Sequence, residues 1–519
     1  MKRSFVTEAF VLMAAASVNR VVGFIYQAKI YRLIGPEGVG LFNLVYPVYV
    51  LIIVMATAGI PLGISKLVSE EEARGNHRGS YQILWLSMSI LIITGSGFTL
   101  VSYFISPVLQ KYVFFNKMVY PIFLCLLPGV FIISVSSAFR GFFQGLMNMK
   151  PPALGQVIEQ IARVIIGLSL ANFLLPRGIQ WAAMGLAAAS VAGELAGLLV
   201  MTVLFVKEKP NYLRRTGLPD KRTSLTILRK LFELCLPITL GRLALTVMLS
   251  VDAVLIPFML RKAGYSTSAA TAVYGQLTGV ALTLLFVPSV ITISLATSLL
   301  PAISEAVAQN RRLLVRSRTS DAVRITVLAG LPFIAAFLVL PTQITEAIYR
   351  SPESGKLLSI LAVGGILAYI QQTTTGVLQG LGQPAIPLKN MVIGGIFKVA
   401  IIYYVTSIPG FGILGCGYAY DIFFLLTAGL NLVSLYSRTG FRLSFRNDIL
   451  KPVTAAFICA VIYSVVYRRT YIICGSVSIS VTLSLILGFT AYLAAVVWLG
   501  SVKQADYNRL PFIRNLLKR

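Results

Sequence analysis

Residues 474–499 read CGSVSISVTLSLILGFTAYLAAVVWL and contain no Asp, Glu, Lys or Arg. An α-helix needs about 20 apolar residues to cross the hydrocarbon core of a bilayer, so this segment is long enough to span one. The same pattern runs through all 519 residues, of which 57% are hydrophobic and 12% are charged. Soluble chains carry about 25% charged residues. The composition therefore excludes a row of soluble domains and predicts a polytopic membrane protein.

Apolar segments of this kind predict an all-α fold with fourteen transmembrane helices. The predicted spans cover residues 6–33, 40–66, 80–106, 118–144, 153–175, 180–206, 231–260, 270–300, 322–348, 357–380, 386–406, 412–436, 451–467 and 474–499. The first follows Lys2 and Arg3 in the manner of a signal peptide. Its apolar residues continue to Ile34, so we expect it to be retained as a helix.

Lysine and arginine are distributed unequally between the two sides of the membrane. The termini and the loops on their side carry 30 of the 45 basic residues, and the opposite side carries 11. The positive-inside rule therefore places both termini in the cytoplasm and predicts a multi-pass protein of the plasma (inner) membrane. The loop at 207–230 holds eight of these charges, and we interpret it as a topology anchor at the membrane surface. The net charge of +27 thus needs no nucleic-acid partner.

The residue types on which metal and redox sites depend are sparse. Five cysteines are scattered without a CxxC pair, and His77 is the only histidine. The glycine pattern at 410–415 matches a dinucleotide motif by letter, but it lies in a predicted loop rather than after a strand. We therefore expect no catalytic residues, no metal site, no cofactor and no enzyme activity.

An internal repeat relates the two halves of the chain. The motif Gln-Gly-Leu at 144–146 recurs at 379–381, and at the same offset of 235 residues Arg163 matches Lys398. Spans 1–6 thus match spans 7–12, and the two repeats are parallel because six spans return the chain to its starting side. Transporters with repeated halves bind their substrate between the halves near the membrane midplane. The repeat therefore favours a transporter over a channel.

The repeat also predicts the domain organisation. The predicted parts are an N-lobe at 1–206, a basic cytoplasmic linker at 207–230, a C-lobe at 231–437, and spans 13 and 14 with a basic tail at 438–519. Glycines four residues apart, such as Gly193 and Gly197, predict that helices pack closely at these points. We expect the protein to be a monomer.

Four basic residues lie well inside predicted spans and form two repeat-related pairs. Arg20 matches Arg242, and Arg163 matches Lys398. A charge at the bilayer centre costs about 2.5 kcal/mol or more, so each should face a protein or water interior. Unpaired cations in a cavity suit an anionic ligand such as a phosphate. Together with Asn19, these residues are the candidate substrate-binding set.

Four acidic residues inside spans leave their role open. Glu159 precedes Arg163 by four residues on one helix face, so Arg163 either forms a local salt bridge or lines a cavity. Glu194, Asp252 and Asp421 have no basic neighbour within four residues. All four either neutralise the basic residues or titrate with a coupling cation.

Four segments carry a resemblance to a known family. Residues 19–24 (NRVVGF), 34–41 (IGPEGVGL), 59–68 (GIPLGISKLV) and 236–243 (LPITLGRL) resemble the MOP exporter superfamily. The match is closest to its polysaccharide-flippase branch, including the stage V sporulation protein B group. It runs over essentially the whole chain, and the family has fourteen spans with a six-plus-six repeat.

The resemblance implies a flippase that moves an undecaprenyl-pyrophosphate-linked saccharide to the outer leaflet by alternating access through a cationic cavity. The saccharide would be a cell-wall, spore-cortex or polysaccharide precursor. Arg20 and Arg242 match the family's basic positions in the first and seventh spans. Tyr26 and residues 52–53 stand where the peptidoglycan branch has basic residues, which favours a sporulation-type or general saccharide flippase. The implied partners are this lipid-linked saccharide, membrane lipids and envelope-synthesis enzymes.

Two alternatives remain at this point. A cation-coupled antiporter of small organic molecules, as in the multidrug-exporter branch, would depend on Asp252 or Asp421. A membrane scaffold that recruits envelope enzymes through its basic loops would tolerate every substitution of an intramembrane charge.

Overall fold

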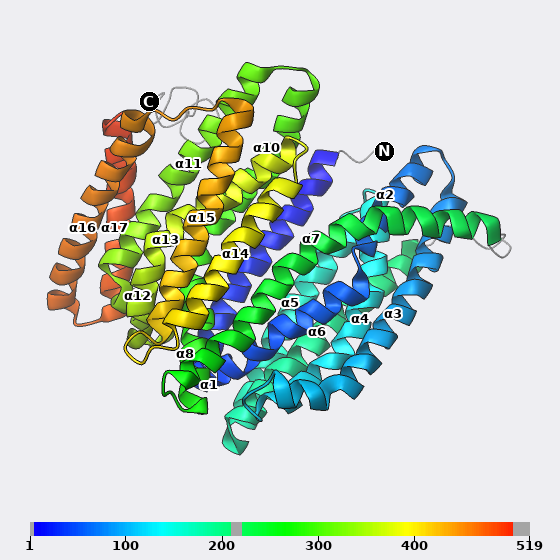
Figure 1. Cartoon of the computed structure of the whole chain (residues 1–519), viewed down its shortest axis with the longest axis horizontal. Coiled ribbons are helices and arrows are strands. Elements are labelled where there is room, and N and C mark those ends of the chain that lie inside the picture. The colour runs from blue at the N-terminus through cyan, green and yellow to red at the C-terminus, as the bar shows by residue number, and fades with distance from the viewer. Residues whose placement is uncertain (1–4, 209–220, 502–519) are drawn as a thin grey trace. The chain divides into compact units, whose positions relative to one another are not determined.

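The computed structural model describes residues 5–208 and 221–501 (Figure 1). Within these ranges the chain consists of helices joined by short turns, without a strand. Fourteen of the described helical segments are long and apolar enough to cross a membrane. The predicted all-α polytopic fold with fourteen membrane helices is therefore confirmed.

The helices form two compact units, residues 1–279 and 280–519. Unit 1 contains α1 (Phe5–Thr57), α2 (Ile60–Ala73), α3 (His77–Tyr112), α4 (Val119–Gly145), α5 (Lys150–Leu174), η1 (Leu175–Arg177), α6 (Ile179–Glu208), α7 (Lys221–Lys262) and α8 (Thr267–Gln276). The π-helix η3 (Leu277–Ala281) crosses the boundary between the units. Unit 2 contains α9 (Leu282–Phe286), α10 (Ser289–Ala308), α11 (Arg312–Val339), α12 (Pro341–Tyr349), η4 (Pro352–Ser354), α13 (Gly355–Gly380), α14 (Ala385–Val405), α15 (Ile413–Thr439), η5 (Phe445–Leu450), α16 (Lys451–Cys474) and α17 (Val477–Trp498).

Two of the predicted spans have different boundaries in the structure. The predicted second span, 40–66, is broken at Ala58 and Gly59, both of which have positive φ, so it is divided between α1 and α2. The predicted eighth span, 270–300, is interrupted before α10, which begins next to Pro288. Proline has no backbone N–H to donate, and this favours a break at that point.

The first predicted span and the larger part of the second form the two arms of α1, which are separated by a sharp break. Gly35 has φ 71° and ψ −179°, and Pro36 follows it. Glycine adopts a positive φ without the steric cost that a Cβ would add. The break lets residues before and after position 35 line the same part of unit 1.

The helix boundaries repeat at the predicted offset of 235 residues. Helix α2 ends at Ala73 and α10 at Ala308, while α4 ends at Gly145 and α13 at Gly380. The packing repeats as well. A Cβ at Gly145 would meet the side chain of Val68 on α2, and a Cβ at Gly380 would meet the equivalent residue of α10, at position 303. Each unit thus contains the same glycine-mediated helix pair.

Repeat-related residues also touch each other inside unit 1, where α1 meets α8. A Cβ at Gly40 would collide with the backbone oxygen of Thr271, and a Cβ at Gly275 would collide with that of Pro36. Gly40 and Gly275 are repeat partners, 235 residues apart, and so are Pro36 and Thr271. The two contacts are therefore equivalent. Beyond them, Asn43 Nδ2 donates to Oγ1 of position 278, its own repeat partner, at 2.9 Å. Reciprocal contacts of this kind mark a local two-fold axis.

The compact units divide at a different place from the predicted lobes. Helices α7 and α8, which begin the second repeat, pack against α1 and therefore belong to unit 1. The division into functional lobes at 1–206 and 231–437 stays a prediction. Half of the basic linker, residues 209–220, lies outside the described residues, as does most of the predicted basic tail, residues 502–519.

Candidate functional site

A polar cavity lies inside unit 1 between α1, α5 and α6. Its volume is about 280 Å³, comparable with the lower end of the range for small-molecule sites, about 300–1,000 Å³. Its polar lining residues are Asn19, Gln27, Asn43, Gln160, Arg163 and Ser190. Four of these six are side-chain amides, each of which both donates and accepts hydrogen bonds.

The sequence of α1 places both of its arms on the cavity wall. Asn19, Gly23 and Gln27 recur every four residues and therefore share one helix face. Because the chain turns at Gly35, residues 39–46 line the same cavity from the second arm. Gly23 leaves room for the facing helix, since a Cβ there would lie 3.5 Å from the amide nitrogen of Gln160.

Aromatic rings form a further part of the wall. Tyr26 comes from the first arm of α1, and Phe42 and Tyr46 come from the second. The rings of Phe42 and Tyr46 are stacked, with their centroids 5.4 Å apart. The cavity thus combines flat apolar surfaces with amide groups, as small-molecule sites commonly do.

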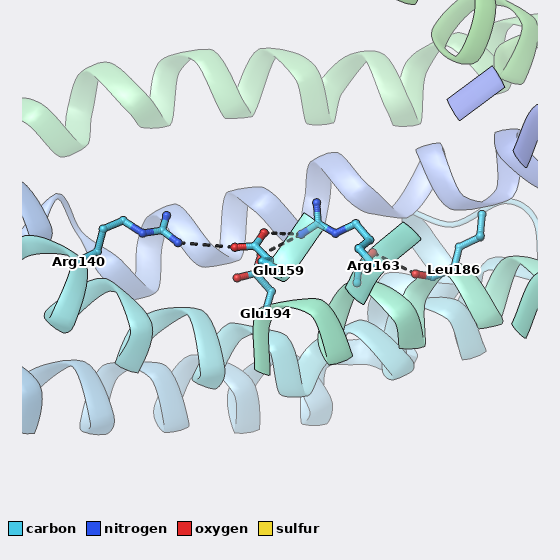
Figure 2. Close-up of polar contacts among 6 residues, drawn as sticks. Arg140, Glu159, Arg163, Leu186 and Glu194 are labelled. Carbon is cyan, nitrogen blue, oxygen red and sulfur yellow. Dashed lines mark hydrogen bonds and ion pairs between the residues drawn. The ribbon is translucent and has the colours of Figure 1, made fainter. Parts of the chain in front are cut away.

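Arg163 belongs to a half-buried network of four charges at this wall (Figure 2). Its Nη2 donates to Glu159 Oε1 at 2.7 Å and to Glu194 Oε1 at 3.2 Å. Glu159 Oε2 also forms an ion pair with Arg140 Nη2 at 3.8 Å. The two arginines and two glutamates carry no net charge together. Of the two interpretations of Arg163, the structure thus shows both the salt bridge and the cavity lining.

Small residues on α6 bring Glu194 into reach of α5. A Cβ at Gly193 would lie 2.8 Å from the backbone oxygen of Glu159, and one at Gly197 would lie 3.2 Å from the Glu159 Cβ. The close packing predicted for these two glycines is confirmed. The network therefore depends on glycine as much as on the charged side chains.

The repeat-related pair Arg20 and Arg242 has a different environment. Both side chains are exposed, on membrane-spanning parts of α1 and α7. Neither forms an ion pair within the described ranges of the chain. Arg20 follows Asn19, which lines the cavity. These two arginines are available to an anionic ligand, whereas Arg163 already has two carboxylates.

Lys398 lies in unit 2 and is 1% exposed. Its Nζ lies 4.7 Å from the ring centroid of Tyr420 and 5.2 Å from that of Phe423, both on α15. The repeat counterparts of Glu159 and Glu194 in this unit are glycines, at positions 394 and 429. Unit 2 therefore also has a cation at this position, but two aromatic rings lie close to it in place of the glutamates.

The other two predicted acids are in separate places. Asp421 Oδ1, in unit 2, accepts a hydrogen bond from the backbone N–H of Gly364 at 3.0 Å. Asp252, on α7 in unit 1, is 2% exposed. Neither lines the cavity described above. Their part in ion coupling stays a prediction.

Two arginines escaped sequence reasoning, one half-buried and one buried. Arg140 lies near the end of α4, where a basic residue resembles an ordinary membrane-interface charge, and its partner comes from α5. Arg324, on α11, is 1% exposed and donates to the backbone oxygen of Ser501 at 3.0 Å. No local sequence signal marks either contact, because both partners are distant in sequence. Among the described residues, no group of three or more His, Cys, Asp or Glu could hold a metal ion.

Comparison with known proteins is consistent with this architecture. The profile of the polysaccharide biosynthesis protein family matches residues 5–307, and the MatE profile matches residues 258–404. The chain is 33% identical to stage V sporulation protein B of Bacillus subtilis (strain 168) over the full length of both. It is 25% identical to the lipid II flippase MurJ of the same organism, over 77% of each chain.

Solved structures show the same fold. A lipid II flippase MurJ in an inward closed conformation matches with a TM-score of 0.71 and 14% identity, over 94% of this chain and 98% of that one. A multidrug resistance MATE family transporter in an inward-facing conformation matches with a TM-score of 0.65 and 17% identity, over 81% and 94%. The chain therefore belongs to the polysaccharide biosynthesis protein family of the MOP exporter superfamily.

Proposed function

We propose that this protein is a flippase that moves a polyprenyl-pyrophosphate-linked saccharide from the inner to the outer leaflet of the plasma membrane. One observation supports the proposal above all. Arg20 is exposed on a membrane-spanning helix, without an ion pair in the described part of the chain, beside a polar cavity. A cation in this position is costly unless it faces a protein or water interior, where it can bind an anionic ligand. Stage V sporulation protein B and MurJ, which resemble this chain, point to the same class of function.

The position of Arg20 on α1 suits a ligand with an anionic and a neutral part. Gln27 follows seven residues later, two helical turns or about 10 Å along the axis, and lies within about 20° of the same direction. Arg20 therefore lies at the edge of the helix face that lines the cavity, near the N-terminal end of that face. A pyrophosphate bound at Arg20 would leave its attached group within reach of the cavity.

Arg242 is the repeat counterpart of Arg20 and supplies a second unpaired cation. Guanidinium groups bind phosphate oxygens through two parallel hydrogen bonds. Two of them match the two phosphates of a pyrophosphate better than a single point charge does. Alternating access would expose these groups first to one leaflet and then to the other, with both termini in the cytoplasm and Lys398 as a further cation.

A vesicle assay tests the proposal directly. Purified protein is reconstituted with a fluorescent polyprenyl-pyrophosphate saccharide, and the fraction accessible from outside is followed with time. Arg20→Gln and Arg242→Gln should each slow translocation roughly tenfold or more, because a hydrogen bond to a charged group contributes about 1.5–3 kcal/mol. Arg229→Gln is the matched control, since Arg229 is an exposed arginine on α7 before its membrane-spanning part.

Two outcomes would overturn the proposal. Wild-type rates for both variants would remove Arg20 and Arg242 from the site. An absence of translocation by the wild type, together with exchange of organic cations against a proton or sodium gradient that requires Asp252 or Asp421, would favour the antiporter.

A further inference from the structure

We infer that the cavity of unit 1 binds the saccharide part of the transported lipid and discriminates it from the bare pyrophosphate lipid. The inference rests on the proposed function and assigns a ligand class to one specific cavity. It divides the substrate between two places, with the pyrophosphate at the exposed arginines and the sugar among the amides of α1 and α5.

The charge of the cavity wall argues against an anion there. Arg163 is the charged residue among those that line the cavity, and its Nη2 already donates to Glu159 and Glu194. Arg140 forms an ion pair with Glu159, so the two arginines balance the two glutamates. A pyrophosphate beside Arg163 would meet two glutamates at close range, and a cation would meet two arginines. A neutral ligand avoids both repulsions.

The uncharged lining residues have the chemistry that sugar hydroxyls need. Gln27, Gln160 and Asn19 present amides, which donate and accept in the same way as a hydroxyl does. Phe42 and Tyr46 present aromatic surface, against which the apolar face of a sugar ring can pack. An apolar drug would displace water from these half-buried amides without replacing its hydrogen bonds, and this carries a penalty for each of them.

The equivalent positions of the second repeat lack the amide side chains of this site. Gln160 corresponds to Gly395 in unit 2, and Gln27 corresponds to Leu249 on α7 by the offset that relates Arg20 to Arg242. The buried cation at 398 contacts the rings of Tyr420 and Phe423 there. The amide cluster is therefore particular to unit 1, so variants of Gln27 and Gln160 test this cavity alone.

Binding in detergent is the first measurement, because it does not depend on transport. Native mass spectrometry would compare polyprenyl pyrophosphate with and without a disaccharide at equal chain length. Wild type should prefer the saccharide-bearing lipid. Gln27→Leu and Gln160→Leu should each reduce this preference about 3- to 10-fold, the effect of one neutral hydrogen bond, while binding of the bare lipid is unchanged.

Gln156→Leu is the matched control. Gln156 is half-buried on the same helix, one turn before Gln160, and does not line the cavity. Only variants that melt at the same temperature as the wild type are compared, so that misfolded protein is not scored as a loss of binding. The same lipids are then followed in vesicles.

The outcomes separate the two proposals. A wild type that binds both lipids equally, or cavity variants that weaken both lipids by the same factor, would overturn the saccharide site. Selective loss of saccharide binding would support it. A wild type that prefers the saccharide lipid in detergent but translocates neither lipid in vesicles would overturn the flippase and leave the binding site in place.

Discussion

Glu159→Gln should destabilise the protein far more than the loss of an ordinary surface salt bridge. The glutamate carboxylate faces both Arg163 and Arg140, at 2.7 and 3.8 Å. Its neutralisation leaves two arginines with one remaining carboxylate, that of Glu194, and so leaves one uncompensated positive charge inside the helix bundle. Arg163 keeps Glu194, so the charge left without a partner is that of Arg140, whose side chain is 31% exposed, whereas those of Glu159 and Arg163 are 15% and 22% exposed. Water therefore screens part of this charge.

The magnitude follows from burial. Removing one partner of a buried ion pair costs about 3–5 kcal/mol. Arg163 keeps Glu194 at 3.2 Å and Arg140 is partly exposed, so we expect about 2–3 kcal/mol, which corresponds to a fall in melting temperature of roughly 2–5 °C for a chain of this length. Glu233→Gln is the matched control. Glu233 also pairs with an arginine four residues away, but in solvent, where such a pair contributes about 0.3–0.5 kcal/mol.

Thermal unfolding of the detergent-solubilised protein measures both variants. The double variant Glu159→Gln/Arg140→Gln restores charge balance, so it should lose less stability than the sum of the single variants. Equal melting temperatures for Glu159→Gln and Glu233→Gln would refute the reasoning, since they would mean that the network is as well solvated as a surface pair.

Three further predictions concern other contacts. Gly40→Ala should destabilise the protein by about 1–3 kcal/mol because its Cβ would collide with α8. Gly97→Ala is the control: a Cβ there meets open space in α3, so this change should stabilise the protein by about 0.5–1 kcal/mol in the same melting assay. A double-mutant cycle of Lys398→Met and Tyr420→Leu should give a coupling energy of about 2 kcal/mol, as expected for a desolvated cation over an aromatic ring; a coupling near zero would contradict it. Arg324→Ala should remove about 1.5–3 kcal/mol of hydrogen bonding at the end of α17, seen as faster hydrogen exchange of residues 495–501 and not of α16.

The sequence was sufficient for the number of spans because each apolar run is decided locally, by about 20 neighbouring residues. The break after α1, at Gly59, and the break before α10, at Pro288, were harder to predict. Proline and glycine are common in membrane helices, so Gly59 and Pro288 did not stand out from glycines and prolines that leave their helices intact. Hydropathy therefore predicted the spans but missed the breaks within two of them.

The candidate site shows where local reasoning ends. The contact between Glu159 and Arg163 followed from their spacing of four residues. Glu194 and Arg140 reach the same place from α6 and α4, and no spacing rule relates them to α5. For Lys398, the absence of a nearby acid suggested a ligand, but in the structure its Nζ lies close to aromatic rings on another helix. Contacts between helices require packing that a single sequence does not contain.

The reciprocal contact between α1 and α8 has a consequence for the origin of the chain. Gly40 and Gly275 occupy the same position of the two repeats, and each meets the repeat partner of the residue that the other meets. Such a contact needs only one surface, used twice, so a homodimer of a half-length ancestor could have formed it before the gene was duplicated and fused. After fusion, a change at either glycine still disturbs the shared interface. At the positions of Arg163 and Lys398, by contrast, the two halves have become chemically different.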